Sequence, residues 1–241
     1  MRPEFCGLLA QDMRSRERPV RVRWAVCLLK PDALIFDLDG TLWDAAAASA
    51  VGWNRALAES GTPHRVDVAG IRSVSGTPFA QCVETLLPEL GPPSEATLRS
   101  LDAGERAGIE AVGGVLYPGV AAGLRRLAGV YPLFLVSNCP DWYLEAFLDK
   151  DGLRECFTAW DCHGAAGESK PAMLRRLSER FGLTRGVYVG DTRGDQIAAE
   201  QAGMQFAHVT YGFGVAGAPD LVFAAFDELV AYYLAPSGFT D

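Results

Sequence analysis

Two carboxylates, Asp37 and Asp39, directly follow a short apolar run at Ala33–Phe36. Such a run predicts a buried strand, and side chains two apart in an extended segment point the same way. Both carboxylates can then face one point, where a magnesium ion would offset their repulsion. Asp37 could serve as a nucleophile towards phosphorus and Asp39 as a proton carrier. The alternative is a strand that ends in an acidic turn at Gly40, because Asp and Gly are common turn residues.

Polar residues also follow two later apolar runs that predict buried strands, and a lysine precedes a predicted helix. They are Ser137 and Asn138 after the run at 133–136, Asp191 and Asp195 after the run at 187–189, and Lys170 just before Pro171. Ligands of parallel α/β sheets bind beyond the carboxyl ends of the strands. We therefore expect these groups to meet Asp37 and Asp39 at one rim. The alternatives are a serine that caps the following turn and a lysine exposed on the surface.

The elements that must position these residues fall into two groups. Between residues 44 and 114 the sequence predicts only helices, at 45–60, 78–87 and 97–112. After residue 119, strands at 133–136, 187–189, 206–209 and 221–223 alternate with helices at 120–127, 142–148, 172–181 and 196–202. This alternation predicts an α/β fold, a doubly wound parallel sheet with a Rossmann-like core. The all-helical stretch is then an inserted α-helical cap domain.

We expect three parts along the chain. They are a basic N-terminal extension at 1–31, a catalytic core at 32–43 and 115–241, and a helical cap at 44–114. Residues 1–30 contain seven basic and three acidic residues, although the whole chain has a net charge of −8. We interpret the extension as poorly ordered or as an artefact of the chosen start. The alternative is an arm that binds nucleic acid or a membrane.

The composition is typical of a soluble globular protein. Of the 241 residues, 49% are apolar and 22% are charged. The negative net charge argues against a nucleic-acid-binding protein. There is neither an apolar run of membrane-spanning length nor a signal peptide, so we expect no membrane partner and a cytoplasmic location. The six cysteines show no paired metal spacing, and we interpret them as free thiols in a reducing compartment.

The ordered set of motifs resembles the haloacid dehalogenase-like hydrolase superfamily. Within it, the chain is similar to the phosphoglycolate phosphatase-like and beta-phosphoglucomutase-like branch with a helical cap. The motifs are Asp-Leu-Asp-Gly-Thr-Leu at 37–42, Ser-Asn at 137–138, Lys-Pro at 170–171 and Gly-Asp-Thr-Arg-Gly-Asp at 190–195. The resemblance covers roughly residues 32–235. Each motif alone is common, but the four in this order are specific.

The resemblance implies a role for each motif residue. Asp37 attacks phosphorus and forms an aspartyl-phosphate, while Asp39 protonates the leaving oxygen and then activates water. Mg²⁺ is held by the side chains of Asp37 and Asp191 and by the backbone carbonyl of Asp39. The phosphoryl oxygens are held by Ser137, with Asn138 beside it, and by Lys170. Asp195 does not contact the substrate and positions either the metal ligands or Lys170.

The resemblance also implies the activity, a magnesium-dependent phosphatase for a small phosphorylated metabolite, phosphoglycolate-like or a sugar phosphate. Asp39 favours this over carbon–halogen cleavage, because the dehalogenases of the superfamily lack an acid there. A sugar phosphomutase with the same residues remains an alternative, as does a non-catalytic binding protein. The latter is disfavoured because no motif residue is missing. Ala45 and Cys139 depart from the residues that are frequent in the family, which leaves the substrate open.

The predicted cap would close over the substrate, with hinges near 43–44 and 115–119. Arg72 and the turn at 75–77 are candidates for contacting the end of the substrate remote from the phosphate. Arg72 suits an anionic end, and an exposed arginine is the alternative.

Several other patterns receive structural interpretations. The glycine pattern at 212–217 opens no amphipathic helix, which indicates a mobile loop near the rim and not a dinucleotide site. Asp161-Cys162-His163 is interpreted as a loop, because nothing completes a metal site there. His208 is expected to be a hydrogen-bonded histidine in the core or at the sheet end. Trp142 and Tyr143 are interpreted as core residues.

Overall fold

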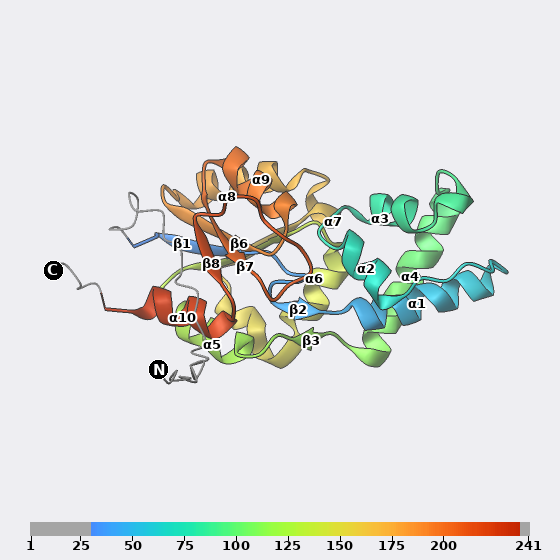
Figure 1. Cartoon of the computed structure of the whole chain (residues 1–241), viewed down its shortest axis with the longest axis horizontal. Helices are drawn as coiled ribbons and strands as arrows, with labels where there is room; N and C mark the ends of the chain where they lie inside the picture. Colours follow the sequence, from blue (N-terminus) through green and yellow to red (C-terminus); the bar gives the residue numbers. More distant parts are fainter. Residues whose placement is uncertain (1–29, 237–241) are drawn as a thin grey trace, which may run out of the picture.

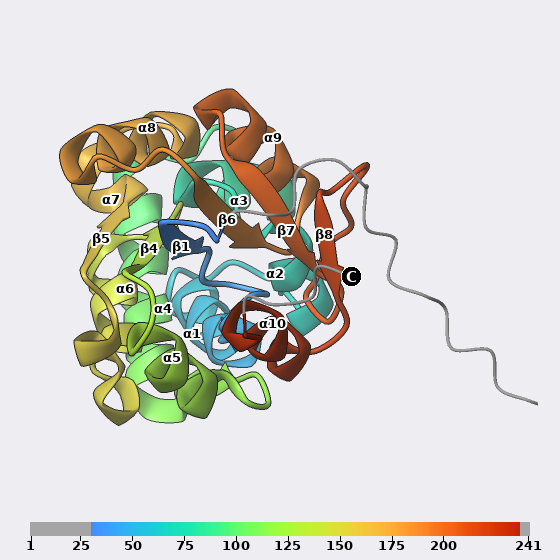
Figure 2. The same ribbon diagram turned by 90° about the vertical axis from the view of Figure 1, so that its left-hand side faces the viewer.

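The computed structural model describes residues 30–236, and its centre is a six-stranded parallel sheet (Figure 2). The strand order is β5-β4-β1-β6-β7-β8. The strands are β1 Ala33–Phe36, β4 Leu133–Ser137, β5 Ala159–Cys162, β6 Gly186–Gly190, β7 Gln205–Val209 and β8 Leu221–Phe223. This architecture confirms the predicted doubly wound α/β fold. The predictions for residues 1–29, including Cys6 and Cys27, lie outside the described residues.

Strand β1 lies in the middle of the sheet, between β4 and β6. Its four side chains are fully buried, which explains why its sequence is a continuous apolar run and does not alternate. Leu34 and Phe36 belong to one hydrophobic cluster, and Ala33 and Ile35 to the other. Because β1 is parallel to both neighbours, its carboxyl end lies beside the carboxyl ends of β4 and β6.

Helices cover both faces of the sheet (Figure 2). One layer contains α8 Lys170–Phe181 and α9 Arg193–Ala202. The other contains α5 Val120–Ala128, α6 Asp141–Leu148 and α10 Phe226–Leu234, with the short 3-10 segment η2 Lys150–Cys156 beside α5 and α6. Each layer packs an apolar stripe on the sheet, so the core is divided by the sheet into two clusters.

The prediction of a loop at Asp161-Cys162-His163 is wrong. Asp161 and Cys162 end the edge strand β5, and His163 begins the short helix α7, His163–Ala166. Strand β5 was not predicted, because an edge strand is only half buried and needs no continuous apolar run.

The all-helical segment forms a separate bundle at one end of the molecule, shown in blue to green at the right of Figure 1. It comprises α1 Ala46–Glu59, α2 Val68–Val74, α3 Phe79–Leu86, the 3-10 turn η1 Pro88–Leu90, and α4 Glu95–Val112. It has its own hydrophobic cluster around Trp53, Leu57 and Leu101. Helix α2 was not predicted, because its sequence includes Gly70 and spans only seven residues.

Helices α1 and α4 approach closely through glycines. A Cβ atom on Gly52 of α1 would lie 2.1 Å from the backbone oxygen of Gly104 on α4, and one on Gly108 would lie 2.4 Å from the oxygen of Ala48. Neither Gly52 nor Gly108 therefore has room for a side chain, and both are required for backbone contact between the helices. This contact fixes the face of α4 that is turned towards α1.

Two short strands join this helical cap to the rest of the chain. β2 Trp43–Asp44 and β3 Val115–Leu116 pair antiparallel, with Trp43 opposite Leu116. The two segments predicted as hinges thus lie side by side, and their hinge role stays a prediction. None of the helices in residues 30–236 combines the length and apolarity needed to cross a membrane.

Candidate active site

Asp37 follows β1 directly and its side chain is fully buried. Its backbone N–H donates to the carbonyl of Val189 at 2.8 Å, which extends the pairing of β1 with β6. The chain then turns at Gly40, whose φ is +78°. A Cβ atom on Gly40 would lie 2.3 Å from Oδ2 of Asp191, so this position tolerates only glycine.

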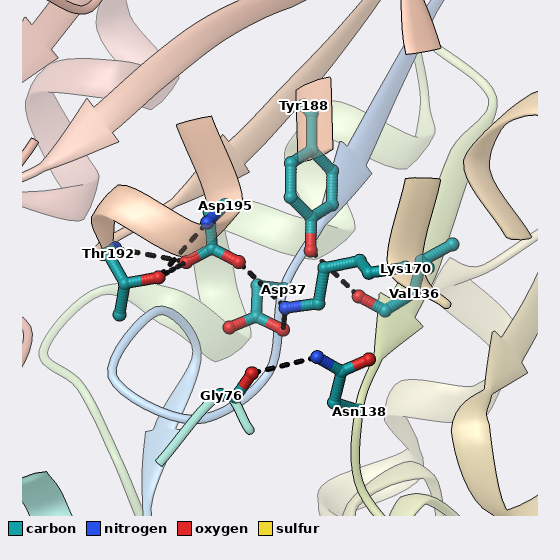
Figure 3. A network of polar contacts seen from close by, with 8 residues as sticks. All are labelled: Asp37, Gly76, Val136, Asn138, Lys170, Tyr188, Thr192 and Asp195. Atoms are coloured by element: carbon teal, nitrogen blue, oxygen red, sulfur yellow. Dashed lines mark hydrogen bonds and ion pairs between the residues drawn. The ribbon is translucent and has the colours of Figure 1, made fainter. Parts of the chain in front are cut away.

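Lys170 lies at the start of α8 and points at the end of β1 (Figure 3). Its Nζ donates to Oδ1 of Asp37 at 2.8 Å and to Oδ1 of Asp195 at 2.7 Å, and only 4% of the residue is exposed. Burial alone would lower the pKa of Lys170, but Asp195 and Asp37 together raise it well above its usual value. The ammonium is therefore a permanent positive charge between two carboxylates.

Asp195 is positioned by a capping box at the start of α9. Its Oδ2 accepts from the backbone N–H of Thr192 at 3.0 Å and from the Thr192 hydroxyl at 2.6 Å. In return, Oγ1 of Thr192 accepts from the backbone N–H of Asp195 at 3.1 Å. Both carboxylate oxygens of Asp195 thus have partners, one in the capping box and one in Lys170 (Figure 3).

Asp191 is held by a loop from a distant part of the chain. Its Oδ2 accepts from the backbone N–H groups of Phe213 at 2.7 Å and Gly214 at 3.2 Å. A Cβ atom on Gly212 would lie 2.4 Å from Cβ of Asp191. The glycines at 212–217 therefore allow a loop to pack against a carboxylate, a role that the sequence analysis missed. The loop does lie at the rim, as predicted.

One oxygen from each of Asp37, Asp191 and Asp195 lies within 4.8 Å of the others. Within residues 30–236, Oδ2 of Asp37 and Oδ1 of Asp191 are buried without any hydrogen-bond partner. Burial raises the pKa of Asp37 to about 6 and that of Asp191 to about 8, and the charge of Asp195 adds to both shifts. Unpartnered carboxylate oxygens that converge in this way are the ligands that Mg²⁺ prefers, so the residues fit a magnesium ion.

Asp39 is half-buried, and its Oδ1 accepts a hydrogen bond from the Tyr143 hydroxyl at 2.6 Å. Burial raises the pKa of Asp39 to about 7, against the opposing effect of this hydrogen bond. Tyr143 belongs to the core, as predicted, since it is 5% exposed and packs edge-on against Trp43. Its polar contact was missed because the pairing spans 104 residues of sequence. Trp142 is partly buried and packs against the hydrophobic cluster that contains Tyr143 and Trp43.

Ser137 ends β4 with 2% of the residue exposed, beside the carboxyl end of β1. Asn138 links this rim to the cap, because its Nδ2 donates to the carbonyl of Gly76 at 2.8 Å (Figure 3). Its Oδ1 is buried without a partner among the described residues. The rim and the turn at 75–77 are thus in direct contact.

Arg72 lies elsewhere. Its Nε donates to Oδ2 of Asp44 at 3.0 Å, and its guanidinium carbon lies 5.6 Å from the ring centroid of Phe213. Arg72 therefore joins cap helix α2 to the connecting strand β2 and to the loop that holds Asp191.

His208 lies in β7 with only 6% of the residue exposed. Its ring packs near Phe206, and burial lowers its pKa. Its Nδ1 has no hydrogen-bond partner among residues 30–236. The ring also forms a hydrogen bond with the backbone of Gly190, so the prediction of a hydrogen-bonded histidine in the core or at the sheet end is confirmed.

A pocket of about 560 Å³, including the part open to solvent, lies between the rim and the cap. The core contributes Asp39, Ser137, Asn138, Cys139, Pro140 and Tyr143 to its wall. The cap contributes Ala46, Ser49, Trp53, Ile71, Val74, Ser75, Gly76, Thr77, Phe79, Cys82 and Glu105. Arg72 is not part of this wall, whereas the turn at 75–77 is. The structure thus brings together all the rim residues expected from the sequence, and it leaves Arg72 outside.

Comparisons with known proteins agree with this geometry. The family model for haloacid dehalogenase-like hydrolases matches residues 31–203. A phosphoglycolate phosphatase of Pseudomonas syringae pv. tomato is 32% identical over 197 residues, 76% of this chain and 71% of that protein. A phosphoglycolate phosphatase of Yersinia pestis is 32% identical over 219 residues, 84% of this chain and 93% of that protein.

Solved structures share the fold. A haloacid dehalogenase-like family protein from Streptococcus pneumoniae superposes with a TM-score of 0.69 at 23% identity and covers 84% of this chain and 98% of its own. A crystal structure described as a predicted phosphoglycolate phosphatase from Haemophilus somnus 129PT gives 0.73 at 23% identity, with 85% and 99% covered. With the motif residues gathered at one rim and the family model matched over most of the chain, this protein belongs to the haloacid dehalogenase-like hydrolases.

Proposed function

We propose that this protein is a magnesium-dependent phosphatase that hydrolyses the phosphomonoester of a small metabolite through an aspartyl-phosphate on Asp37. The observation that carries the proposal is the pair of unpartnered, buried oxygens on Asp37 and Asp191 beside the Lys170 ammonium. A nucleophile, a cation site and a fixed positive charge occur together there. This combination suits phosphoryl transfer, in which negative charge on the phosphoryl oxygens must be neutralised.

In this proposal the Asp37 carboxylate attacks phosphorus, and the bond from phosphorus to the leaving oxygen breaks. Lys170 and Ser137, with Asn138 beside it, hold the phosphoryl oxygens and keep the group in line with Asp37. Mg²⁺, held by Asp37, Asp191 and the backbone carbonyl of Asp39, would supply further positive charge to the phosphoryl group. Asp195 holds Lys170 in place and contacts no reacting atom.

Asp39 moves the proton in both steps. It first gives a proton to the leaving oxygen, and then, as a carboxylate, it takes one from the water that cleaves the aspartyl-phosphate and releases phosphate. A group with a pKa of about 7 can do both near neutral pH. The Tyr143 hydroxyl fixes the orientation of Asp39 by donating to its Oδ1.

The substrate is a small phosphorylated metabolite, and the relatives named phosphoglycolate phosphatases make phosphoglycolate-like esters one candidate class beside sugar phosphates. We further propose a catalytic core at 32–43 and 115–241 and a cap at 44–114. This division is supported by the cap's own hydrophobic cluster around Trp53, while Ala45, Ala48 and Ile109 of the cap pack with the core. A cytoplasmic location is also proposed. It is supported by the four cysteines of the described chain, which are free thiols.

The proposal is tested by release of phosphate from p-nitrophenyl phosphate in the presence of Mg²⁺. Asp37→Asn keeps the shape of the side chain but removes the nucleophile, so kcat should fall by about 10³-fold or more. Near-ultraviolet circular dichroism checks that the variant is folded. Equal rates for the variant and the wild type would contradict the proposal. If free phosphate is not formed but phosphate isomers interconvert with a catalytic bisphosphate, the protein is instead a phosphomutase.

A further inference from the structure

The pocket beside Asp39 is where the organic part of the substrate must lie. Asp39 protonates the leaving oxygen in the proposed function, so the alcohol portion extends from Asp39 away from Asp37. The pocket wall includes Asp39 and is completed by cap residues. Its charges therefore decide which alcohols are accepted.

The charged residue types in this wall are all acidic. Of the residues that form it, Asp39 and Glu105 are acidic, and none is a lysine, an arginine or a histidine. The nearby cations have other partners. Lys170 lies between Asp37 and Asp195, and Arg72 pairs with Asp44. The pocket wall thus contains no cation that could pair with a carboxylate on the substrate.

Glu105 is buried in the cap, with 7% of the residue exposed. It lies on α4 between Gly104 and Gly108, and these glycines turn this face of the helix onto α1. Burial raises the pKa of Glu105, and the negative charge of Asp102 raises it further. Hydrogen bonds from the Ser49 hydroxyl and the Trp53 indole oppose part of this rise in pKa. No ion pair involving Glu105 is found within residues 30–236.

A buried carboxylate without a cation is costly, and a ligand that brings the cation removes that cost. Two aromatic rings of the cap, Trp53 and Phe79, pack edge-on with centroids 5.5 Å apart and form part of the same wall. Aromatic faces also attract cations. A carboxylate on the substrate would instead lie beside the acidic Glu105, in surroundings that screen charge poorly.

We propose that Glu105 is a specificity-determining residue that pairs with an ammonium group of the substrate, so that the preferred substrates are phosphorylated amino alcohols. This inference rests on the proposed phosphatase activity and narrows it. It separates this chain from its relatives named phosphoglycolate phosphatases, because the glycolate carboxylate would enter the acidic pocket.

Three two-carbon esters of similar size test the inference: 2-aminoethyl phosphate, 2-hydroxyethyl phosphate and 2-phosphoglycolate. They differ in having a cationic, a neutral or an anionic end. With the wild-type protein and Mg²⁺, we expect kcat/KM to fall in that order, by about tenfold or more at each step. If 2-phosphoglycolate is hydrolysed as well as or better than 2-aminoethyl phosphate, the inference is wrong.

Variants of Glu105 test whether this residue causes the order of kcat/KM among the three esters. Glu105→Gln keeps the shape and removes the charge, so the ratio of kcat/KM between the cationic and the anionic ester should fall to within about threefold of unity. Glu110→Gln is the matched control, because Glu110 is exposed on the same helix and pairs with Arg106. This control should keep the wild-type ratio. A Glu105→Gln protein that is folded and keeps the wild-type ratio would overturn the inference. If Glu105→Gln does not fold, the three-ester series on the wild type still decides.

Failure of the inference is distinct from failure of the proposed function. If p-nitrophenyl phosphate is hydrolysed and the order of the three esters is reversed, only the role of Glu105 is wrong. If neither the aryl ester nor any of the three alkyl esters releases phosphate, the phosphatase proposal itself fails, and this inference fails with it.

Discussion

Acidic side chains are buried in two regions of the molecule, the rim of the sheet and the cap pocket, and their neighbours differ. At the rim, Asp37 and Asp195 share the ammonium of Lys170, and Asp191 accepts from two backbone N–H groups. In the pocket, Glu105 has only neutral neighbours to oppose the rise in its pKa. The rim is thus built around charges that belong to the protein, whereas the pocket is suited to a charge that arrives with the ligand.

The two regions also differ in how their residues are held. The rim residues follow strands β1 and β6 or begin helices α8 and α9, so the sheet fixes their positions. Glu105 lies within α4 of the cap, outside the sheet. In this arrangement the chemistry of the rim is independent of the alcohol, and the cap can change the accepted alcohol without moving the catalytic groups.

Removing the cation from the rim should have the largest effect. Lys170→Met leaves two buried carboxylates unpaired, so we expect about 10³-fold lower kcat and a free energy of unfolding lower by about 3 kcal/mol. Phosphate release and urea unfolding measure the two changes. Lys150→Met, at a partly exposed position, should change neither. A Lys170→Met protein with wild-type stability would show that the rim does not depend on its internal cation.

The second largest effect is expected from Mg²⁺, whose binding should depend on the acidic residues of the rim and not on Glu105 of the pocket. Mg²⁺ in hundredfold excess over its dissociation constant should raise the free energy of unfolding by about 2.7 kcal/mol. Chelation should abolish phosphatase activity, and added Mg²⁺ should restore it. Asp191→Asn should lose the thermal shift with Mg²⁺, and Glu105→Gln should keep it. If Glu105→Gln also loses the thermal shift, the pocket acid belongs to the metal site and the two regions do not differ in this way.

The pH dependence of stability sharpens the comparison for Asp39, which borders both regions. Its pKa is raised from 3.8 to about 7 by burial, so the folded state favours the protonated form. Its stabilising contribution is complete below pH 3.8 and is lost as the pH rises through 7. In metal-free solution, Asp39→Asn should therefore be more stable than the wild type at pH 8, by a few kcal/mol, and equal to it near pH 4. Thermal melts across this range measure the difference, and parallel curves would contradict it.

Arg72 should have the smallest effect. Its side chain is about half exposed and pairs with Asp44, so Arg72→Gln should lower the free energy of unfolding by less than about 1 kcal/mol. Because Arg72 is outside the pocket wall, the order of kcat/KM for the three two-carbon esters should not change. A selective loss of activity towards 2-phosphoglycolate would show that Arg72 reaches the pocket and supplies the cation that its wall lacks.

Most of the rim could be predicted because the motif residues stand at the ends of elements. Strand β1 is an uninterrupted apolar run, and Pro171 marks the start of α8, so the positions of Asp37 and Lys170 followed from local sequence. Edge strand β5 and the short helix α2 lacked such signals. The N–H groups of Phe213 and Gly214 could not be predicted, since a backbone donor has no signature of its own in the sequence.

By itself, the sequence determined the α/β fold, because the period of apolar residues is a local property of each strand and helix. It also determined the composition of the rim, because the motif residues stand at the ends of these elements and parallel strands bring their carboxyl ends together. Only the tertiary structure decided that Tyr143 reaches Asp39, that Arg72 is held by Asp44, and that Glu105 enters the pocket. The Tyr143 contact depends on how α6 packs beside the end of β1, and the other two depend on how the cap helices pack and how the cap sits over the sheet. That packing is set by many contacts distant in sequence, and no short stretch of residues encodes it.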